Sequence, residues 1–255
     1  MVHFIGVDIG STSTKVAVLN AQEQLVFQHV RPTGWSSVDT ASGIRQELAA
    51  QGIDVEKEPV VATGYGRIAV PYANKTVTEI TCHGRGAAWL FGPGSYHVVD
   101  IGGQDTKVIL LQDGVVKDFI MNDKCSAGTG RFLEIMASTM GVDLNELAEL
   151  ARQGGGVTIS SMCTVFAESE VISMIGAGRR REDIAYGVVD SITDKVRSQC
   201  LRLHQQGRVV LTGGLCQVPY ILEVLSTKLG TTVETQPLAR YAGAIGAART
   251  AKTLP

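Results

Sequence analysis

The same ten-residue pattern occurs twice in the chain, and this repeat constrains the fold more than any other feature. Residues 7–16 read V-D-I-G-S-T-S-T-K-V, and residues 99–108 read V-D-I-G-G-Q-D-T-K-V. Each copy follows an apolar stretch, runs into an alternating apolar stretch, and is followed by a polar turn and a third extended segment. One such loop is weak evidence, but two copies with the same flanks indicate a duplicated structural unit.

The pattern of apolar residues predicts an α/β fold of two lobes, each a mixed sheet flanked by helices. We expect one lobe at 1–94, completed by a C-terminal helix within 241–255, and the other at 95–240. Around the repeats the expected strands are 3–7, 15–19, 25–30, 96–99, 107–111 and 115–121. The other expected elements are strands at 59–63, 208–211 and 232–234 and helices at 38–51, 80–90, 130–140, 144–153, 164–176, 184–205, 219–229 and 241–251. Asp143 and Glu146 form a capping box for the helix at 144–153.

Composition indicates a packed globular protein and argues against a nucleic-acid binder. The chain has 255 residues, of which 44% are hydrophobic and 19% charged, so we expect a packed core large enough for two modest lobes or one large domain. A net charge of -2 does not favour a nucleic-acid binder, because such proteins normally carry a basic excess.

The location expected from the sequence is the cytoplasm. The first residues lack the basic and apolar regions of a signal peptide, and no apolar run is long enough to span a bilayer. The five cysteines are an odd number without close pairs, so a disulfide framework is not expected and a reducing compartment fits best.

Each repeat places an aspartate, Asp8 or Asp100, at the end of a strand and follows it with a tight turn of small residues. Backbone N–H groups in such a turn converge on phosphate oxygens, and glycine permits close approach of the ligand. The two carboxylates are candidates for holding Mg²⁺ through water, because Mg²⁺ keeps most of its hydration shell. Gln104 and Asp105 are candidates for positioning the water that attacks ATP, because they lie in the second phosphate loop. The predicted phosphate-binding residues are Gly10, Ser11, Thr12, Ser13, Thr14, Lys15, Gly102, Gly103 and Thr106.

Two further segments fit a nucleotide-binding protein. Gly213 and Gly214 follow a short strand, where flat backbone can lie against an adenosine. Residues 242–248 read A-G-A-I-G-A-A and predict a helix that is small on one face, which suits close helix packing at a hinge. The order of these loops resembles the superfamily of sugar kinases, Hsp70 and actin. That resemblance implies two ribonuclease-H-like lobes with ATP between them.

Cys125 and Cys163 each precede a predicted helix. A helix N-terminus favours a thiolate, and thiolates are the usual ligands of iron–sulfur clusters. A [4Fe–4S] cluster usually needs four cysteines, so two chains related by a two-fold axis would supply them. From spacing alone the alternative of two buried or partly buried thiols stays open. Cys82, Cys200 and Cys216 are expected to be core thiols.

Several longer motifs resemble one family in detail. They are A-T-G-Y-G-R at 62–67, T-E-I-T-C-H at 78–83, the D-I-G-G-Q-D-T-K loop, residues 124–134 and residues 160–168. They resemble the activator component of 2-hydroxyacyl-CoA dehydratases and the related ATPase subunits of benzoyl-CoA reductase, over essentially the whole chain. The resemblance implies that Cys125 and Cys163 hold one [4Fe–4S] cluster between the two subunits of a homodimer. We also count Gly128 and Gly130 among the cofactor-binding residues.

The resemblance implies a mechanism as well. Reduced flavodoxin or ferredoxin reduces the cluster, ATP binding and hydrolysis change the angle between the lobes, and the electron passes to a separate dehydratase or reductase component. The sequence leaves two alternatives to compare with this function. A sugar or amino-sugar kinase needs a substrate pocket with a catalytic base, for which the chain is short and shows no sugar-binding pattern. An actin-like scaffold would have no use for Cys125 and Cys163 at helix starts.

Overall fold

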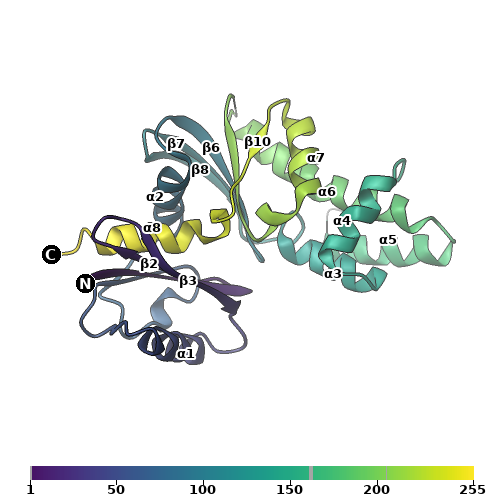
Figure 1. Ribbon diagram of the computed structural model, residues 1–255. Coiled ribbons are helices and arrows are strands. Elements are labelled where there is room, and N and C mark those ends of the chain that lie inside the picture. Colours follow the sequence, from purple (N-terminus) through teal and green to yellow (C-terminus); the bar gives the residue numbers. More distant parts are fainter. Residues whose placement is uncertain (1, 161–162, 205) are drawn as a thin grey trace. The chain divides into compact units, whose positions relative to one another are not determined.

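The computed structural model describes residues 2–160, 163–204 and 206–255 (Figure 1). Met1, Ser161, Met162 and Gln205 lie outside the described residues, and with them one residue of the helix predicted at 184–205 and two of the motif at 160–168. The chain divides into two compact units. Unit 1 comprises Met1–Ser95, Leu111–Lys117 and Leu238–Pro255, and unit 2 comprises Tyr96–Leu110 and Asp118–Pro237.

The first sheet has five strands in the order β3-β2-β1-β4-β5. Its strands are β1 (His3–Ile9), β2 (Ser13–Asn20), β3 (Leu25–Pro32), β4 (Val60–Thr63) and β5 (Lys75–Thr76). β2 pairs antiparallel with both β1 and β3, whereas β4 runs parallel to β1 and β5 runs parallel to β4. The first repeat therefore forms the tight connection between β1 and β2.

Helices cover both faces of this sheet. They are α1 (Ser37–Ala50), α2 (Glu79–Phe91) and α8 (Ala242–Ala251). Successive strand residues point to opposite faces. Ile5 and Val7 accordingly pack in one buried cluster with Ile44 of α1, whereas Ala17 packs in another with Ile245 of α8. The central strands β1, β2 and β4 are thus largely buried on both sides, whereas the outer strands β3 and β5 are partly or fully exposed.

The small face of α8 permits the close packing that the sequence predicts. A Cβ at Gly246 would overlap the backbone carbonyl of Cys82 in α2, and a Cβ at Gly86 would overlap the carbonyl of Ala242. The backbones of α2 and α8 therefore approach each other directly, and larger side chains would force them apart.

The second sheet has five strands in the order β10-β9-β6-β7-β8. Its strands are β6 (Ser95–Ile101), β7 (Thr106–Gln112), β8 (Val115–Asn122), β9 (Val209–Gly213) and β10 (Val233–Glu234). Read from β8, this order matches that of the first sheet strand for strand, with β6 in the place of β1 and β9 in the place of β4. The predicted fold class, two mixed sheets flanked by helices, is confirmed.

Unit 2 adds a set of helices to its sheet. They are α3 (Gly130–Met140), α4 (Leu144–Gln153), α5 (Thr164–Gly176), α6 (Arg181–Arg202) and α7 (Pro219–Leu229). Short 3₁₀ helices occur at Arg67–Ala69 (η1), Gly214–Gln217 (η2) and Ala239–Tyr241 (η3). The Asp143 carboxylate accepts from the backbone N–H groups of Asn145 and Glu146, each at 2.8 Å, so the predicted cap of α4 is confirmed.

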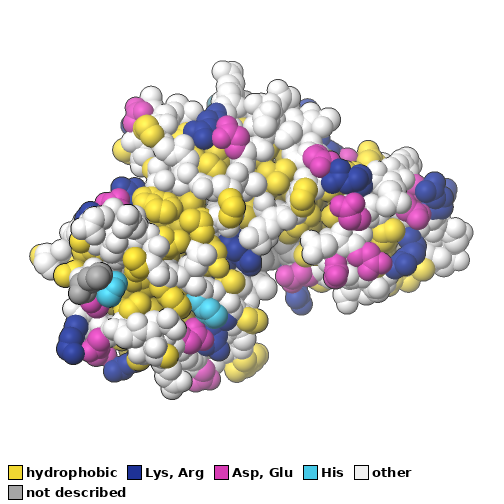
Figure 2. All heavy atoms as spheres, in the orientation of Figure 1, with side chains coloured by type: hydrophobic (Ala, Val, Ile, Leu, Met, Phe, Trp, Pro, Cys, Tyr) yellow, Lys and Arg dark blue, Asp and Glu magenta, His cyan; other side chains and the backbone are white. Residues whose placement is uncertain are grey.

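The predicted end of α6 is wrong. The helix ends at Arg202, and residues 203 and 204 form a turn. His204 has a φ of +52°, a left-handed conformation that a helix does not continue through. Among the described residues, no helix is both long and apolar enough to cross a membrane. On the face that Figure 2 shows, acidic and basic side chains are interspersed over the surface of each unit.

Candidate functional site

Asp8 lies buried between glycine-containing segments of unit 1. It is next to last in β1, opposite Lys15 of β2 and beside Thr63 of β4, and it is 5% exposed. A Cβ at Gly64 would lie 2.6 Å from one carboxylate oxygen, and a Cβ at Gly243 would lie 2.5 Å from the other. Only residues without a side chain leave room for the carboxylate here.

Buried hydroxyl groups support the first phosphate loop. Thr33 Oγ1 donates to the carbonyl of Gly10 at 2.7 Å and lies 2.9 Å from Thr14 Oγ1. Because the single hydrogen of Thr33 is used, Thr14 is the donor in this pair. The hydroxyl of Thr14 is therefore bonded inside the protein, whereas Ser11 and Thr12 are exposed.

Asp100 occupies the equivalent position in unit 2. It lies beside Thr212 of β9, as Asp8 lies beside a threonine of β4, and Thr212 Oγ1 donates to Asp100 Oδ1 at 3.0 Å. A Cβ at Gly213 would lie 2.7 Å from the same oxygen. The φ of +84° at Gly213 matches the +83° at Gly64. The duplication therefore extends beyond the two loops to the parallel strand beside each of them.

A buried lysine distinguishes the second loop from the first. Lys107 is 0% exposed, and its Nζ lies 3.2 Å from Asp100 Oδ2 and 2.8 Å from Asp105 Oδ1. The equivalent Lys15 is only partly buried, with its Nζ 3.5 Å from the carbonyl of Ser13. Ser13 stands where the second copy has Asp105. A buried cation needs carboxylate partners, and Asp105 supplies one to Lys107. The first copy has the uncharged Ser13 at this position, so the two copies share a backbone path but differ in charge.

The second loop exposes one of its two predicted water-positioning residues. Gln104 is exposed, whereas Asp105 is 4% exposed and held by Lys107. The hydroxyl of Thr106 is also buried and donates to the carbonyl of Gly128 at 2.6 Å. The role of Gln104 stays a prediction, and its side chain is the one of the pair that reaches solvent.

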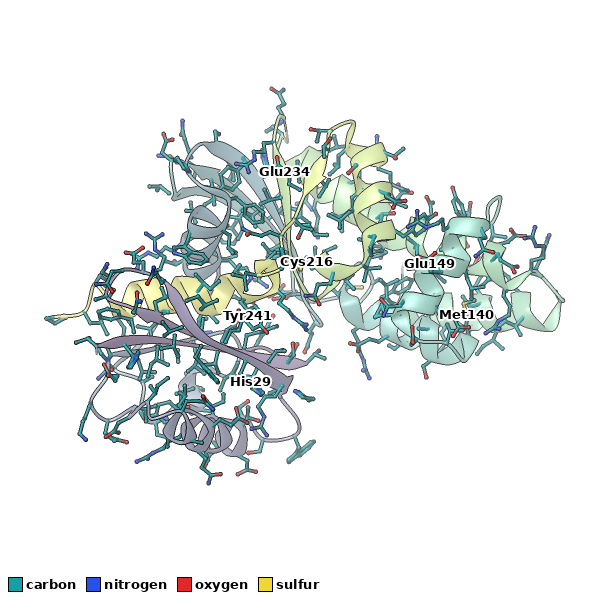
Figure 3. All side chains as sticks on the ribbon, viewed as in Figure 1. His29, Met140, Glu149, Cys216, Glu234 and Tyr241 are labelled. Carbon is teal, nitrogen blue, oxygen red and sulfur yellow. The ribbon has the colours of Figure 1, made fainter. Side chains whose placement is uncertain are left out.

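The predicted adenosine loop turns sharply after β9. Gly213 is buried in a left-handed conformation, and Gly214 is exposed at the start of η2. Cys216 is buried in the same turn, as expected (Figure 3). The backbone at Gly214 is therefore open to a ligand at the carboxyl end of β9.

Cys125 and Cys163 are both exposed and line one pocket of unit 2. The pocket has a volume of about 510 Å³ and is also lined by Lys195 and Arg202 of α6. Cys163 is the N-cap of α5, as predicted. Cys125 precedes α3, which begins at Gly130 as predicted, but residues 126–129 separate this cysteine from the helix N-terminus. What the two thiols share is a pocket rather than a helix N-terminus.

A hydrogen bond joins the two cysteine segments, and another stabilises the first of them. Ser126 Oγ lies 2.8 Å from Thr164 Oγ1, and these residues directly follow Cys125 and Cys163. Asn122 Nδ2 donates to the carbonyl of Cys125 at 2.9 Å. Neither hydroxyl was singled out from the sequence, although a hydroxyl residue directly after the cysteine in both motifs was the available signal.

The other cysteines are core residues, as expected. Cys82 and Cys200 are both 0% exposed, and burial raises the pKa of each thiol to about 12. Both thiols therefore stay protonated at neutral pH, which makes them poor ligands and poor nucleophiles.

The equivalence of the threonine–glycine pairs at the carboxyl ends of β4 and β9 is a further feature of the site that was not predicted from the sequence. Residues 61–64 read V-A-T-G and residues 210–213 read V-L-T-G. These four-residue segments are too short to stand out alone. Their equivalence becomes clear from the strand register, in which Asp8 lies beside Thr63 just as Asp100 lies beside Thr212.

Comparison with known proteins decides the family. Residues 5–251 match the BadF/BadG/BcrA/BcrD ATPase family. The chain belongs to this ATPase family. It is therefore an ATPase, in agreement with its duplicated phosphate loops.

Relatives within the family extend over the whole chain. The (R)-2-hydroxyglutaryl-CoA dehydratase activating ATPase of Acidaminococcus fermentans is 40% identical over 252 residues, covering 97% of this chain and 96% of the relative. The activator of lactoyl-CoA dehydratase of Anaerotignum propionicum is 39% identical over 251 residues, covering 96% of each chain. The resemblance to dehydratase activators is confirmed.

Solved structures agree with this assignment. The activator of 2-hydroxyisocaproyl-CoA dehydratase from Clostridium difficile, solved with bound ADPNP, has a TM-score of 0.90 at 37% identity and covers 98% of this chain and 94% of its own. A ROK family glucokinase from Streptomyces griseus, with glucose and AMPPNP, has a TM-score of 0.63 at 14% identity, covering 99% of this chain and 100% of its own. The second likeness shows the shared fold alone and does not favour a sugar kinase.

Proposed function

We propose that this ATPase is an activator that uses ATP to pass a low-potential electron to a 2-hydroxyacyl-CoA dehydratase or a related reductase. The observation that carries the proposal is the single pocket lined by Cys125 and Cys163, the two exposed cysteines. The family and its full-length relatives support it, since the activators of Acidaminococcus fermentans and Anaerotignum propionicum are named for such dehydratases.

ATP is the proposed substrate of the duplicated loops. Ser11 and Thr12, which are exposed, the partly exposed Ser13 and the backbone N–H groups of Gly103 and Gln104 are suited to phosphate oxygens. The buried carboxylates of Asp8 and Asp100, at equivalent strand ends, suit a hydrated Mg²⁺ that they would contact through water. Gly214 offers flat, exposed backbone to the adenosine.

The donor set of the cysteine pocket fits an iron–sulfur cluster. Thiolates are soft ligands that select iron–sulfur clusters, and Cys125 and Cys163 are the two exposed thiols. We propose that they hold one [4Fe–4S] cluster together with the same two cysteines of a second chain, since such a cluster takes four thiolates. A cluster held there supplies one-electron chemistry, with reduced flavodoxin or ferredoxin as the proposed electron donor.

An exposed apolar surface supports the proposed homodimer. Val165, Phe166 and Ile172 of α5, the helix that follows Cys163, are 65%, 67% and 55% exposed. Exposed apolar side chains of this size on one helix are typical of an interaction surface. We propose that a second chain covers this surface, so that its cysteines face those of the first.

The residues around the pocket would favour an anionic group. The N-terminus of α5 carries a partial positive charge at Cys163, and Lys195 and Arg202 add two cations to the pocket lining. Their charge would offset that of the thiolates. The proposal includes a cytoplasmic location, because a reducing compartment keeps the cysteines available as ligands.

The proposal is tested by activating a dehydratase. The protein is reconstituted with iron and sulfide without oxygen, then mixed with a purified 2-hydroxyacyl-CoA dehydratase, a low-potential reductant and either ATP or ADPNP. We expect dehydratase activity with ATP and none with ADPNP, which is not hydrolysed. Cys125→Ser and Cys163→Ser are expected to bind nucleotide normally and to activate nothing. Activation by a variant that lacks both thiols would refute the proposal.

A further inference from the structure

The segment that carries Cys125 is bonded directly to the second phosphate loop. The backbone N–H of Gly130 donates to the carbonyl of Gly102, and that of Arg131 donates to the carbonyl of Gly103, each at 2.8 Å. The Thr106 hydroxyl donates to the carbonyl of Gly128 at 2.6 Å. Three hydrogen bonds thus tie loop backbone and loop side chain to residues 128–131, so a shift of this loop is transmitted to that segment.

The same segment is bonded at its other end to α5. Thr129 Oγ1 donates to the carbonyl of Ser126 at 2.6 Å, which stabilises the turn before α3. The hydroxyls of Ser126 and Thr164 lie 2.8 Å apart. Each of these two residues is the immediate neighbour of a pocket cysteine, so a shift of Ser126 is passed through this pair to Thr164 and Cys163.

Most residues that make these hydrogen bonds are buried, while Ser126 is partly buried and Arg131 is exposed. Thr106, Gly128, Thr129 and Gly130 are all buried, as is Thr164 at the start of α5. Buried hydrogen bonds are costly to break, because a separated donor or acceptor cannot turn to water. The cheaper response to a displaced loop is therefore a shift of the whole segment, including Ser126.

We infer that Thr106, Ser126 and Thr164 form a relay through which phosphate binding at the second phosphate loop moves Cys125 and, through the hydroxyl pair, Cys163. The inference rests on the proposed function, since it assigns ATP to the loop and a shared ligand to the cysteines. Ser126 and Thr164 are positioning residues: their hydroxyls act through the neighbouring cysteines. Nucleotide in unit 2 thereby adjusts the pocket of the same unit.

The test uses the full-length protein without metal and measures the two thiols directly. Cys125 and Cys163 are alkylated with iodoacetamide in the presence and absence of ADPNP, and each rate is followed by peptide mass spectrometry. In the wild type we expect ADPNP to change the rate at Cys163 by about fivefold or more, the lower end of ordinary coupling between sites. In Ser126→Ala and Thr164→Val we expect unchanged ADPNP affinity and a rate at Cys163 that is equal with and without nucleotide, because the segment of Cys125 is then no longer bonded to that of Cys163.

Matched variants separate a relay from simple support. Thr164→Ser keeps the hydroxyl and should restore the response. Thr139→Val removes another side-chain hydrogen bond between α3 and α5, from Thr139 Oγ1 to Glu168 Oε1 at 3.0 Å, and should leave the response intact. If Thr164→Val does not fold, Ser126→Ala removes the same hydroxyl pair from the opposite side.

The outcomes distinguish the inference from the function on which it rests. If the wild type binds ADPNP and the alkylation rate at Cys163 does not change, or if both relay variants keep the full response, the relay is overturned and the proposed function stands. If the wild type binds no nucleotide, the proposed function fails and the relay with it.

Discussion

At the scale of single residues, two glycines allow close packing against the strands that precede the phosphate loops. Gly64 and Gly213 have φ values of +83° and +84°. A Cβ at either would lie 2.5 Å from a strand carbonyl, that of Ile9 or of Ile101. A side chain there therefore meets both an unfavourable backbone conformation and a steric overlap with the strand that carries the aspartate.

We predict that Gly64→Ala and Gly213→Ala each lower the free energy of unfolding by roughly 2–4 kcal/mol, the sum of backbone strain and overpacking. Gly92→Ala is the control, because Gly92 has a φ of +81° with open space around it. That variant should lose only about 1 kcal/mol. Urea unfolding measures all three, and equal losses would show that the overlap with the strands has no effect.

Lys107 provides a second test, because the repeat supplies its own control. Lys107→Met leaves Asp100 and Asp105 buried without their cation, and we predict a loss of roughly 3–5 kcal/mol in unfolding free energy. The equivalent Lys15→Met affects a partly exposed side chain and should cost less than about 1 kcal/mol. Similar losses for the two variants in urea unfolding would contradict the structural difference between the loops.

The sequence predicted which residues occupy equivalent positions in the two repeats, but it did not predict the hydrogen-bond partners of their hydroxyl groups. The repeat identified Asp8 and Asp100 as equivalent, and the structure places both beside a threonine in a parallel strand. It could not reveal that Thr14 and Thr106 bond inside the protein. Which atoms meet a hydroxyl depends on packing between segments that are distant in the sequence.

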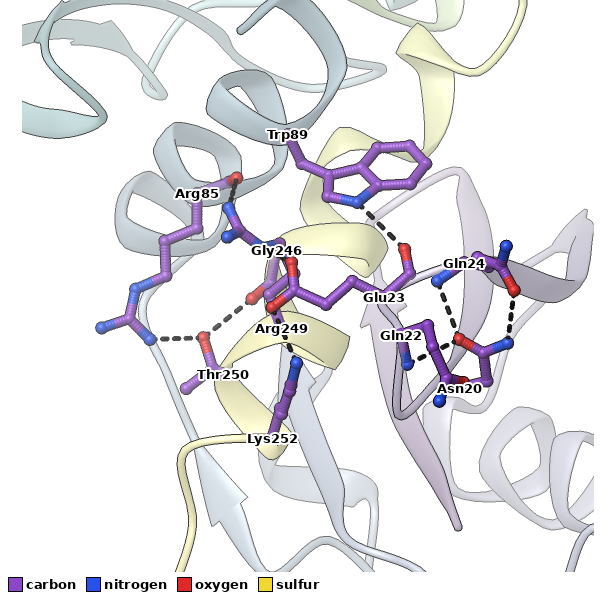
Figure 4. A network of polar contacts seen from close by, with 10 residues as sticks. All are labelled: Asn20, Gln22, Glu23, Gln24, Arg85, Trp89, Gly246, Arg249, Thr250 and Lys252. Atoms are coloured by element: carbon purple, nitrogen blue, oxygen red, sulfur yellow. Dashed lines mark hydrogen bonds and ion pairs between the residues drawn. The ribbon is translucent and has the colours of Figure 1, made fainter. Parts of the chain in front are cut away.

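At the scale of elements, a polar network holds the C-terminal helix in unit 1 (Figure 4). Glu23, in the turn between β2 and β3, lies 3.1 Å from both Arg249 and Lys252. Trp89 Nε1 of α2 donates to the carbonyl of Glu23 at 3.2 Å. Arg85 of α2 reaches α8 as well, donating to Thr250 Oγ1 at 2.7 Å. Three elements far apart in the sequence are thereby joined.

The Glu23 carboxylate makes this network sensitive to acid. Partial burial raises its pKa, but the hydrogen bond and charge of Lys252 together with Arg249 lower it more, so the pKa lies below its ordinary value of 4.5. A carboxyl group whose pKa is lowered on folding stabilises the protein above the unfolded value. That contribution declines as the pH falls below 4.5 and is lost once the pH passes the folded pKa.

We therefore predict that Glu23→Gln lowers the free energy of unfolding by about 0.5–1 kcal/mol near neutral pH and has a smaller effect below the folded pKa. Glu56→Gln is the control, because its ion pair with Arg45 is more exposed, at 57% and 54%. Thermal unfolding across the acid range measures both variants. A pH-independent effect of Glu23→Gln would show that the carboxylate charge does not act here.

Elements with strong local signals were predicted closely. The bounds of α3, α4, α5 and α7 agree with those expected from periodicity and capping. β5, at Lys75–Thr76, was missed because two polar residues carry no strand pattern. The end of α6 was misplaced because a histidine in a left-handed conformation gives no signal comparable to glycine.

At the scale of the whole molecule, the two copies of the sheet have the same topology but different elements around them. Both sheets have the same strand order and the same aspartate–threonine pairing. Unit 2 alone adds the pocket with Cys125 and Cys163 and the hydrogen bonds that connect it to a phosphate loop. The repeat predicted what the units share, whereas the family resemblance, not the repeat, assigned the cysteines a role.

The proposed function requires that two chains share one cluster through Cys125 and Cys163. Native mass spectrometry after reconstitution with iron and sulfide, in the absence of oxygen, measures chain number and metal content together. We expect a species of two chains with about four iron and four sulfide ions, absent from Cys163→Ser. An iron-loaded single chain, or the same iron content in a variant lacking both cysteines, would contradict it.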